Sequence, residues 1–109
     1  MTEQITFGGY IAQARKKLDM SQKELASKVL REDGQPISPQ YLNDIERDRR
    51  NPPPDHLIEQ LAEVLNIPKD ILYHQAGEVP KDLRETEADE EKVIEAWTAF
   101  RRAFRGDQG

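Results

Sequence analysis

A stretch of thirteen residues from Ser38 to Arg50 constrains the fold of this chain more than any other. Ser38 can cap a helix and Pro39 suits a first helical turn, so a helix is predicted to begin here. Leu42 and Ile45 give that helix one apolar edge. The side chains that project outward are those of Gln40, Tyr41, Asn43 and Asp44. The stretch therefore predicts a helix with a buried back and a hydrogen-bonding front.

Arginines follow this helix at once, at positions 47, 49 and 50. Guanidinium groups can hold a phosphate backbone, while polar side chains on a helix front can contact base edges. The leading hypothesis from the residues alone is a DNA-binding helix. A merely solvated helix face and turn would carry the same residue types.

The charge balance has to be reconciled with this hypothesis. The chain has 16 Lys and Arg against 21 Asp and Glu, for a net charge of −5. Residues 1–77 hold 10 basic and 12 acidic side chains, and residues 78–109 hold 6 and 9. DNA binding depends on the local field at the contacting face, which an arginine cluster can supply in a mildly acidic protein. We expect weak non-specific affinity.

The segments on either side show helical apolar spacing. Residues Phe7, Ile11, Ala14 and Leu18 form one stripe, and Ser21 to Glu24 form a capping box before Leu25, Ala26, Val29 and Leu30. A fourth helix is expected from Pro54 or Asp55 to Asn66, with Leu57, Ile58, Leu61, Ala62 and Leu65 inward. A fifth runs from Pro68 to Gly77 with Ile71 and Leu72 inward. The prediction is an all-α fold.

These blocks, taken in order, resemble the helix-turn-helix domain of the Cro and phage-repressor type, the XRE family. The resemblance covers residues 5–77 and is carried by Ser21-Gln22-Lys23-Glu24-Leu25-Ala26, Ser38 to Arg47, Pro52 to Leu57, Leu61-Ala62 and Ile71-Leu72. It implies a five-helix domain whose second helix lies across the DNA backbone and whose third enters the major groove. The implied partner is an operator in double-stranded DNA.

The resemblance also assigns roles to individual residues. The groove-facing positions are Pro39, Gln40, Tyr41 and Asp44, and the implied phosphate contacts are Gln22, Asn43, Arg47, Arg49 and Arg50. Arg15 and Glu46 match positions that form a structural ion pair joining the first and third helices. The chain departs from the family at residues 31–37, where the turn is longer than the usual three or four residues. Either the second helix runs on or a loop bulges out, and Arg31 becomes an extra candidate phosphate contact, with Glu32 and Asp33 facing away.

Residues 78–109 are expected to form a separate unit. An acidic linker at 78–91 precedes a helix at 92–105 with Val93, Trp97, Phe100 and Phe104 on one face. Such an aromatic face needs a cover. It could pack on its own domain, pair with a second copy to make a homodimer, or bind a different protein.

Several function classes find no support in the sequence. There is no cysteine, no phosphate loop and no nucleophile paired with a base, and His56 and His74 have no ligand-spaced partners. We therefore expect no enzyme, no cofactor and no metal. Neither a signal peptide nor a membrane span is expected, and the predicted location is the cytoplasm, on the nucleoid. The two remaining hypotheses are a dimeric repressor reading an inverted repeat and an antitoxin-like interaction protein.

Overall fold

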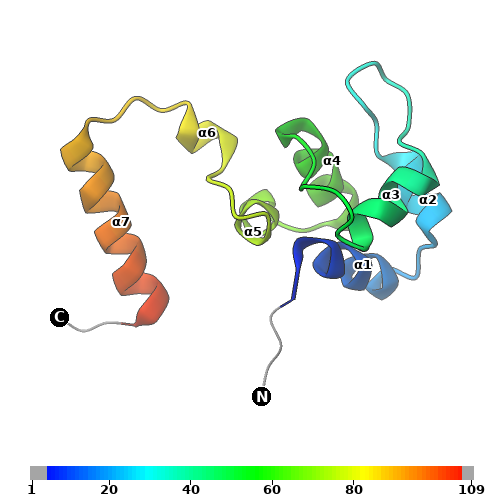
Figure 1. Cartoon of the computed structure of the whole chain (residues 1–109), viewed down its shortest axis with the longest axis horizontal. Helices are drawn as coiled ribbons and strands as arrows, with labels where there is room; N and C mark the ends of the chain where they lie inside the picture. The colour runs from blue at the N-terminus through cyan, green and yellow to red at the C-terminus, as the bar shows by residue number, and fades with distance from the viewer. Residues whose placement is uncertain (1–4, 107–109) are drawn as a thin grey trace.

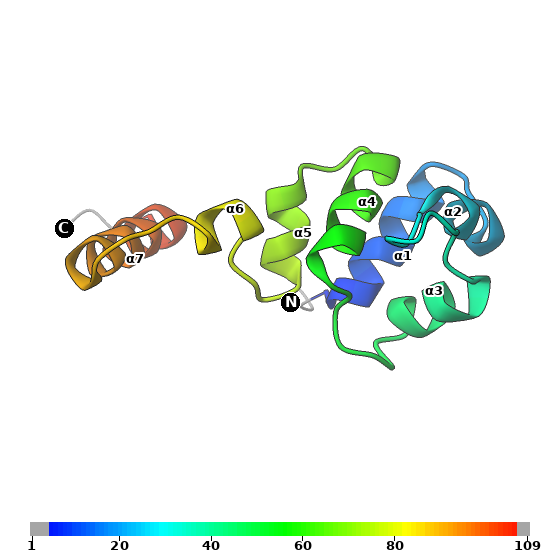
Figure 2. The ribbon, with the colours of Figure 1, turned by 90° about the horizontal axis from the view of Figure 1, so that it is seen from above.

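The computed structural model describes residues 5–106, which contain seven helices and no strand longer than an isolated bridge. The helices are α1 (Phe7–Lys17), α2 (Gln22–Lys28), α3 (Pro39–Glu46), α4 (Asp55–Leu65), α5 (Lys69–Gln75), α6 (Lys81–Arg84) and α7 (Glu90–Arg105). The first five form a bundle, and α7 lies at the end of the molecule opposite α2 and α3 (Figures 1 and 2). The all-α prediction is confirmed. None of the helices in this range is long and apolar enough to cross a bilayer.

The bundle is built on one buried apolar cluster. Helix α3 packs on α1 and α2, while α4 packs on α5, and α5 also contacts α1. The five inward residues predicted for α4 are all buried. Leu25 and Leu42 are completely buried where α2 meets α3. This core fixes the orientation of α3, the helix that carries the candidate site.

Helix ends follow the signals in the sequence. Ser21 accepts a hydrogen bond from the backbone N–H of Glu24, and the Glu24 carboxylate accepts one from the Ser21 N–H, which completes the predicted capping box. These hydrogen bonds also lower the pKa of Glu24. Asn66 ends α4 in the left-handed conformation with φ of 58°. Thr6 caps α1, so that helix starts at Phe7 despite Gly8 and Gly9.

Two inward assignments were wrong. Leu18 caps α1 and is exposed, because the stripe ends with the helix. On α5 the buried pair is Leu72 and Tyr73, and Ile71 is 40% exposed. The buried face of α5 is therefore shifted by one residue from the predicted face. A shift of one residue turns the face by about 100°, because neighbouring side chains on a helix point that far apart.

The segment between α2 and α3 also differs from the prediction that Val29 and Leu30 continue the second helix. Helix α2 stops at Lys28, and Val29 is extended. Leu30 and Pro36 form an isolated antiparallel bridge, and the Ile37 N–H donates to the Val29 carbonyl at 2.9 Å. Of the two alternatives, the structure therefore shows a bulging loop, which projects from the bundle (Figure 1).

The connector after the bundle is more ordered than a plain linker. It contains the one-turn helix α6, and α7 begins at Glu90, two residues before the expected start. Arg84 pairs with Asp55 of α4, which raises the pKa of Arg84 and ties the connector to the bundle.

Candidate nucleic-acid interface

Helix α3 is oriented by its own cap and by its apolar back. The Ser38 hydroxyl accepts from the Tyr41 N–H at 3.0 Å, and Pro39 occupies the first turn. Leu42 and Ile45 are buried in the core, while Gln40 is exposed. Tyr41 and Asp44 are partly exposed. The predicted groove-facing residues thus lie together on the front of α3.

A buried ion pair joins α3 to α1. The Arg15 Nε and Nη2 atoms donate to the two carboxylate oxygens of Glu46 at 2.7 and 2.9 Å, in a bidentate arrangement. Arg15 Nη1 also donates to the Met20 carbonyl at 2.8 Å. The hydrogen bond with Glu46 raises the pKa of Arg15. Because both side chains are at least 89% buried, this pair holds the end of α3 in place.

The ion pair extends outward into an amide network. Gln22 Nε2 donates to Glu46 Oε1 at 2.9 Å and to Asn43 Oδ1 at 3.2 Å. Arg47 Nε donates to the same Asn43 oxygen at 3.3 Å. Asn43 therefore holds the Arg47 guanidinium group directly, and Gln22, the other predicted phosphate contact of this group, holds Asn43. The network links the start of α2 to the end of α3.

Asp44 gathers the remaining predicted residues around one carboxylate. Gln40 Nε2 donates to its Oδ1 at 3.0 Å, and Arg49 and Arg50 approach its two oxygens at 3.8 and 3.5 Å. The Arg50 guanidinium also lies over the Tyr41 ring, 5.0 Å from its centre. These arginine side chains remain more than half exposed, so they stay available to a phosphate.

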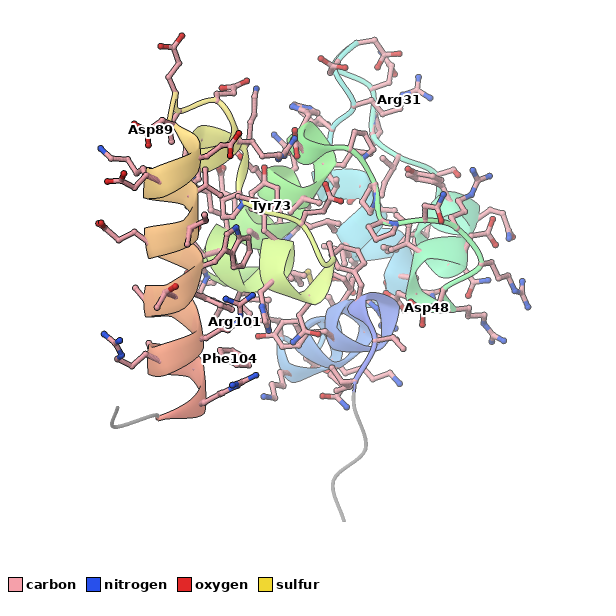
Figure 3. The ribbon with its side chains drawn as sticks, turned by 60° about the vertical axis from the view of Figure 1, so that its left-hand side comes forward. Arg31, Asp48, Tyr73, Asp89, Arg101 and Phe104 are labelled. Atoms are coloured by element: carbon pink, nitrogen blue, oxygen red, sulfur yellow. The ribbon has the colours of Figure 1, made fainter. Side chains whose placement is uncertain are left out.

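Sequence reasoning missed a second joint between α1 and α3. Asp48, with a φ of 58°, accepts hydrogen bonds from the Thr6 hydroxyl at 2.5 Å and the Gly8 N–H at 2.9 Å. A Cβ added to Gly8 would overlap the Ile45 carbonyl oxygen and come within 2.7 Å of the Glu46 carbonyl oxygen. Figure 3 places Asp48 at this junction. The Gly8-Gly9 pair was the available signal, since adjacent glycines in a helix start indicate close backbone approach.

Arg31 stands apart from the α3 face, on the projecting loop (Figure 3). Its guanidinium pairs with Asp33 at 2.7 Å, so Asp33 turns toward Arg31 and does not face away as expected. This pairing lowers the pKa of Asp33. The loop is anchored to α4, because His56 Nε2 lies 2.9 Å from the Leu30 carbonyl oxygen.

The aromatic residues of α7 are gathered but not buried. Trp97 and Phe100 meet edge to face at 5.6 Å, and Phe100 stacks on Phe104 at 5.1 Å. Phe104 also lies 5.5 Å from the ring of His74 on α5. Trp97 and Phe104 nevertheless remain 45% and 67% exposed. Within residues 5–106 no group of three or more His, Cys, Asp or Glu side chains is arranged to hold a metal ion.

Comparisons with known proteins agree with this geometry. A family model described as helix-turn-helix, HTH_3, matches residues 11–72, which contain all of α2, α3 and α4 and the larger parts of α1 and α5. Among curated protein sequences, none matches this chain significantly. A chain in the solved complex of SinR protein and SinI protein is similar in fold, with a TM-score of 0.53 and 24% identity. That alignment covers 93% of the present chain and 89% of the other.

Proposed function

This chain belongs to the helix-turn-helix family HTH_3 and is a DNA-binding transcription regulator, and we propose that it recognises a specific operator sequence through α3. The observation that carries the proposal is the front of α3. Gln40, Tyr41 and Asp44 face outward from a helix whose back is locked into the core. Such a helix fits the major groove of B-DNA, where base pairs differ in their donor and acceptor patterns.

Each exposed side chain has a contact that suits its chemistry. The Gln40 amide can donate to and accept from one adenine, and Asp44 can accept from a cytosine amino group. Pro39 and Tyr41 offer apolar surface beside them. We assign phosphate contacts to Arg47, Arg49 and Arg50, with Gln22 and Asn43 beside Arg47 and with Arg31 as an outlying contact from the loop.

The proposed regulator is a dimeric repressor. Two copies would place one α3 in each half of an inverted repeat, with half-site centres separated by one helical turn or a multiple of it. Occupying promoter DNA would exclude polymerase. The exposed aromatic face of α7, on the end of the molecule away from α3, supports self-association that leaves the reading helices free (Figure 2).

Substitutions on α3 and in the arginine cluster test this assignment. We expect Gln40→Ala to cost about 1–3 kcal/mol on a cognate site and to relax the preference at one base pair. Arg49→Ala or Arg50→Ala should weaken binding to all sequences alike and flatten the salt dependence. The measurement is binding to operator and mutated-operator duplexes across salt concentrations. Equal losses for all three variants on cognate and random DNA would show that α3 is not the reader.

A second candidate function is an antitoxin-like interaction protein whose α7 binds a different protein. The exposed aromatic residues of α7 favour it, as does the presence of the similar fold in a complex of SinR protein with SinI protein. In this case isolated protein should remain monomeric, with Trp97 fluorescence that shifts only when the partner is added. An isolated protein whose α7 is already paired would instead favour the dimeric regulator.

A further inference from the structure

The charges of α7 are separated along its length. Residues 89–95 contain four acids and one lysine, whereas residues 101–105 contain three arginines and no acid. Through both halves the apolar residues Val93, Trp97, Phe100 and Phe104 recur at steps of four, three and four. This is the spacing of a helix pair that packs along a seam. Small residues, Ala96 and Ala103, flank the seam on one side and permit close approach.

The rest of the same chain covers the seam only in part, because Trp97 and Phe100 each remain 45% exposed. Phe104 lies on the side of α7 that faces the bundle (Figure 3), and its ring contacts the ring of His74. Yet no residue of α7 is buried, and Ile94 beside the seam is 66% exposed. Leaving so many large apolar groups in water is unfavourable. The intramolecular contact with α5 therefore leaves most of this face available to a partner.

We propose that α7 pairs with the α7 of a second copy in the antiparallel orientation. Antiparallel packing sets the acidic half of each helix beside the basic half of the other. The two helix dipoles then run in opposite directions, which is also favourable. Parallel packing would set acid beside acid and arginine beside arginine. Charge complementarity thus selects both the occupant, a second copy, and its direction.

The seam fixes the register of this pair. Val93 meets the Phe104 position of the other copy, and Trp97 meets the Phe100 position, so the two-fold axis passes between Thr98 and Ala99. Ile94 then lies against the aliphatic part of the opposite Arg101, and Ala96 lies near the opposite Ala103. This interface supplies the dimer of the proposed repressor and rests on that proposal.

Distances between spin labels test the orientation. The chain has no cysteine, so Glu91→Cys and Thr98→Cys each give one labelling site in the full-length protein. The two positions are seven residues apart on the same outer stripe of α7, so their sideways separations match. In the antiparallel pair, symmetry-related labels are offset along the helix axis by roughly 22 Å at Glu91 and by less than about 2 Å at Thr98.

The expected result is a clearly longer distance for the Glu91 label than for the Thr98 label, lost on dilution with unlabelled protein. Trp97→Ala in the same labelled chains should raise the dimer dissociation constant at least about tenfold, whereas Thr98→Ala should leave it unchanged. Equal distances at the two sites would overturn the proposal in favour of parallel packing. An absence of any intermolecular distance would overturn it as well.

The pairing of α7 and the selection of a DNA sequence can succeed or fail independently of each other. Enrichment of an inverted repeat by a protein without α7 pairing would retain the repressor and move its dimer interface elsewhere. Antiparallel pairing in a protein that prefers no DNA sequence would retain this interface and reject the repressor.

Discussion

Asp44 sits at the centre of the reading face, yet its charge opposes DNA. Its side chain is only 18% exposed and draws Arg49 and Arg50 toward the front of α3. A phosphate backbone must compete with this carboxylate for both arginines. We therefore propose that Asp44 lowers affinity for any duplex and favours those in which a base edge satisfies it.

Replacing this carboxylate should loosen discrimination. We expect Asp44→Asn to raise affinity for non-operator duplex roughly threefold to tenfold at low salt, because the arginines lose an internal competitor. Asp70→Asn on α5 changes the net charge equally and serves as the control. The affinities are measured by fluorescence anisotropy over a salt series. Indistinguishable behaviour of the two variants would show that Asp44 does not restrain the arginines.

Tyr73 provides a pH-dependent element of the core. It is completely buried and its hydroxyl donates to Glu59 at 2.6 Å. Burial, followed by this hydrogen bond to a carboxylate, raises the pKa of Tyr73. The folded state therefore keeps the phenolic proton to higher pH than the unfolded chain does. The resulting stability is complete below the ordinary tyrosine pKa of about 10 and is lost as pH rises above it.

A single substitution isolates this effect. Tyr73→Phe should reduce the alkaline decline in the free energy of unfolding between about pH 9 and pH 11, relative to the parent. Urea denaturation at a series of pH values measures it, with Tyr10→Phe as the control. A decline in Tyr73→Phe as steep as that of the parent would contradict the assignment.

The sequence predicted the residue positions that depend on neighbouring residues in the chain or on the family resemblance. The front of α3 follows from Ser38, Pro39 and the apolar pair behind them. The Arg15–Glu46 pair came from matched positions. Asp48 and Tyr73 could not be found this way, because their partners Gly8 and Glu59 are brought near only by the packing of separate helices.

Among the elements, α1 and α3 meet more closely than any side chain between them would permit. Gly8 lies against the last carbonyl oxygens of α3, where it has room for hydrogen alone. Asp48 then accepts from the Gly8 N–H and fixes the approach. The position of α3 thus depends on α1 at two points, Gly8 and Arg15.

The Gly8 contact is directly testable. Gly8→Ala should lower the free energy of unfolding by about 1–3 kcal/mol, because the added methyl group must push α1 and α3 apart. At Gly9 an added Cβ would meet two side-chain atoms and no backbone, the Thr6 hydroxyl at 3.1 Å and an Ile5 carbon at 3.7 Å, so Gly9→Ala should change stability by less than about 1 kcal/mol. Urea unfolding of both variants decides the point. Similar effects at the two glycines would argue against the close approach.

Helix positions were easier to predict than the connections between them. Apolar stripes and caps located α1 to α5, since both signals lie within each helix. The end of α2 was missed because Val29 and Leu30 continue its apolar pattern, while the extended backbone there is held by Ile37 and Pro36 from the far side of the loop. Helix α6 was missed because its four residues leave no stripe to detect.

In the whole molecule, the candidate DNA-binding surface and the exposed aromatic surface lie at opposite ends. The cluster of Arg47, Arg49 and Arg50 lies at the end that carries α3, and the aromatic helix α7 lies at the other end (Figure 1). A mildly acidic protein of this kind gains little from non-specific attraction to DNA, so we propose that recognition depends on base contacts and on two linked half-sites. In this proposal, self-association through α7 and reading through α3 would each strengthen binding to the operator.

Sequence-specific recognition of DNA through α3 can be tested by selecting duplexes from a random double-stranded DNA library with the full-length protein at about 100 mM salt. We expect enrichment of an inverted repeat whose half-site centres are separated by one helical turn or a multiple of it. Gln40→Ala should alter the enriched sequence at a symmetric pair of positions. Failure to enrich any sequence over several salt concentrations would contradict sequence-specific recognition by this chain.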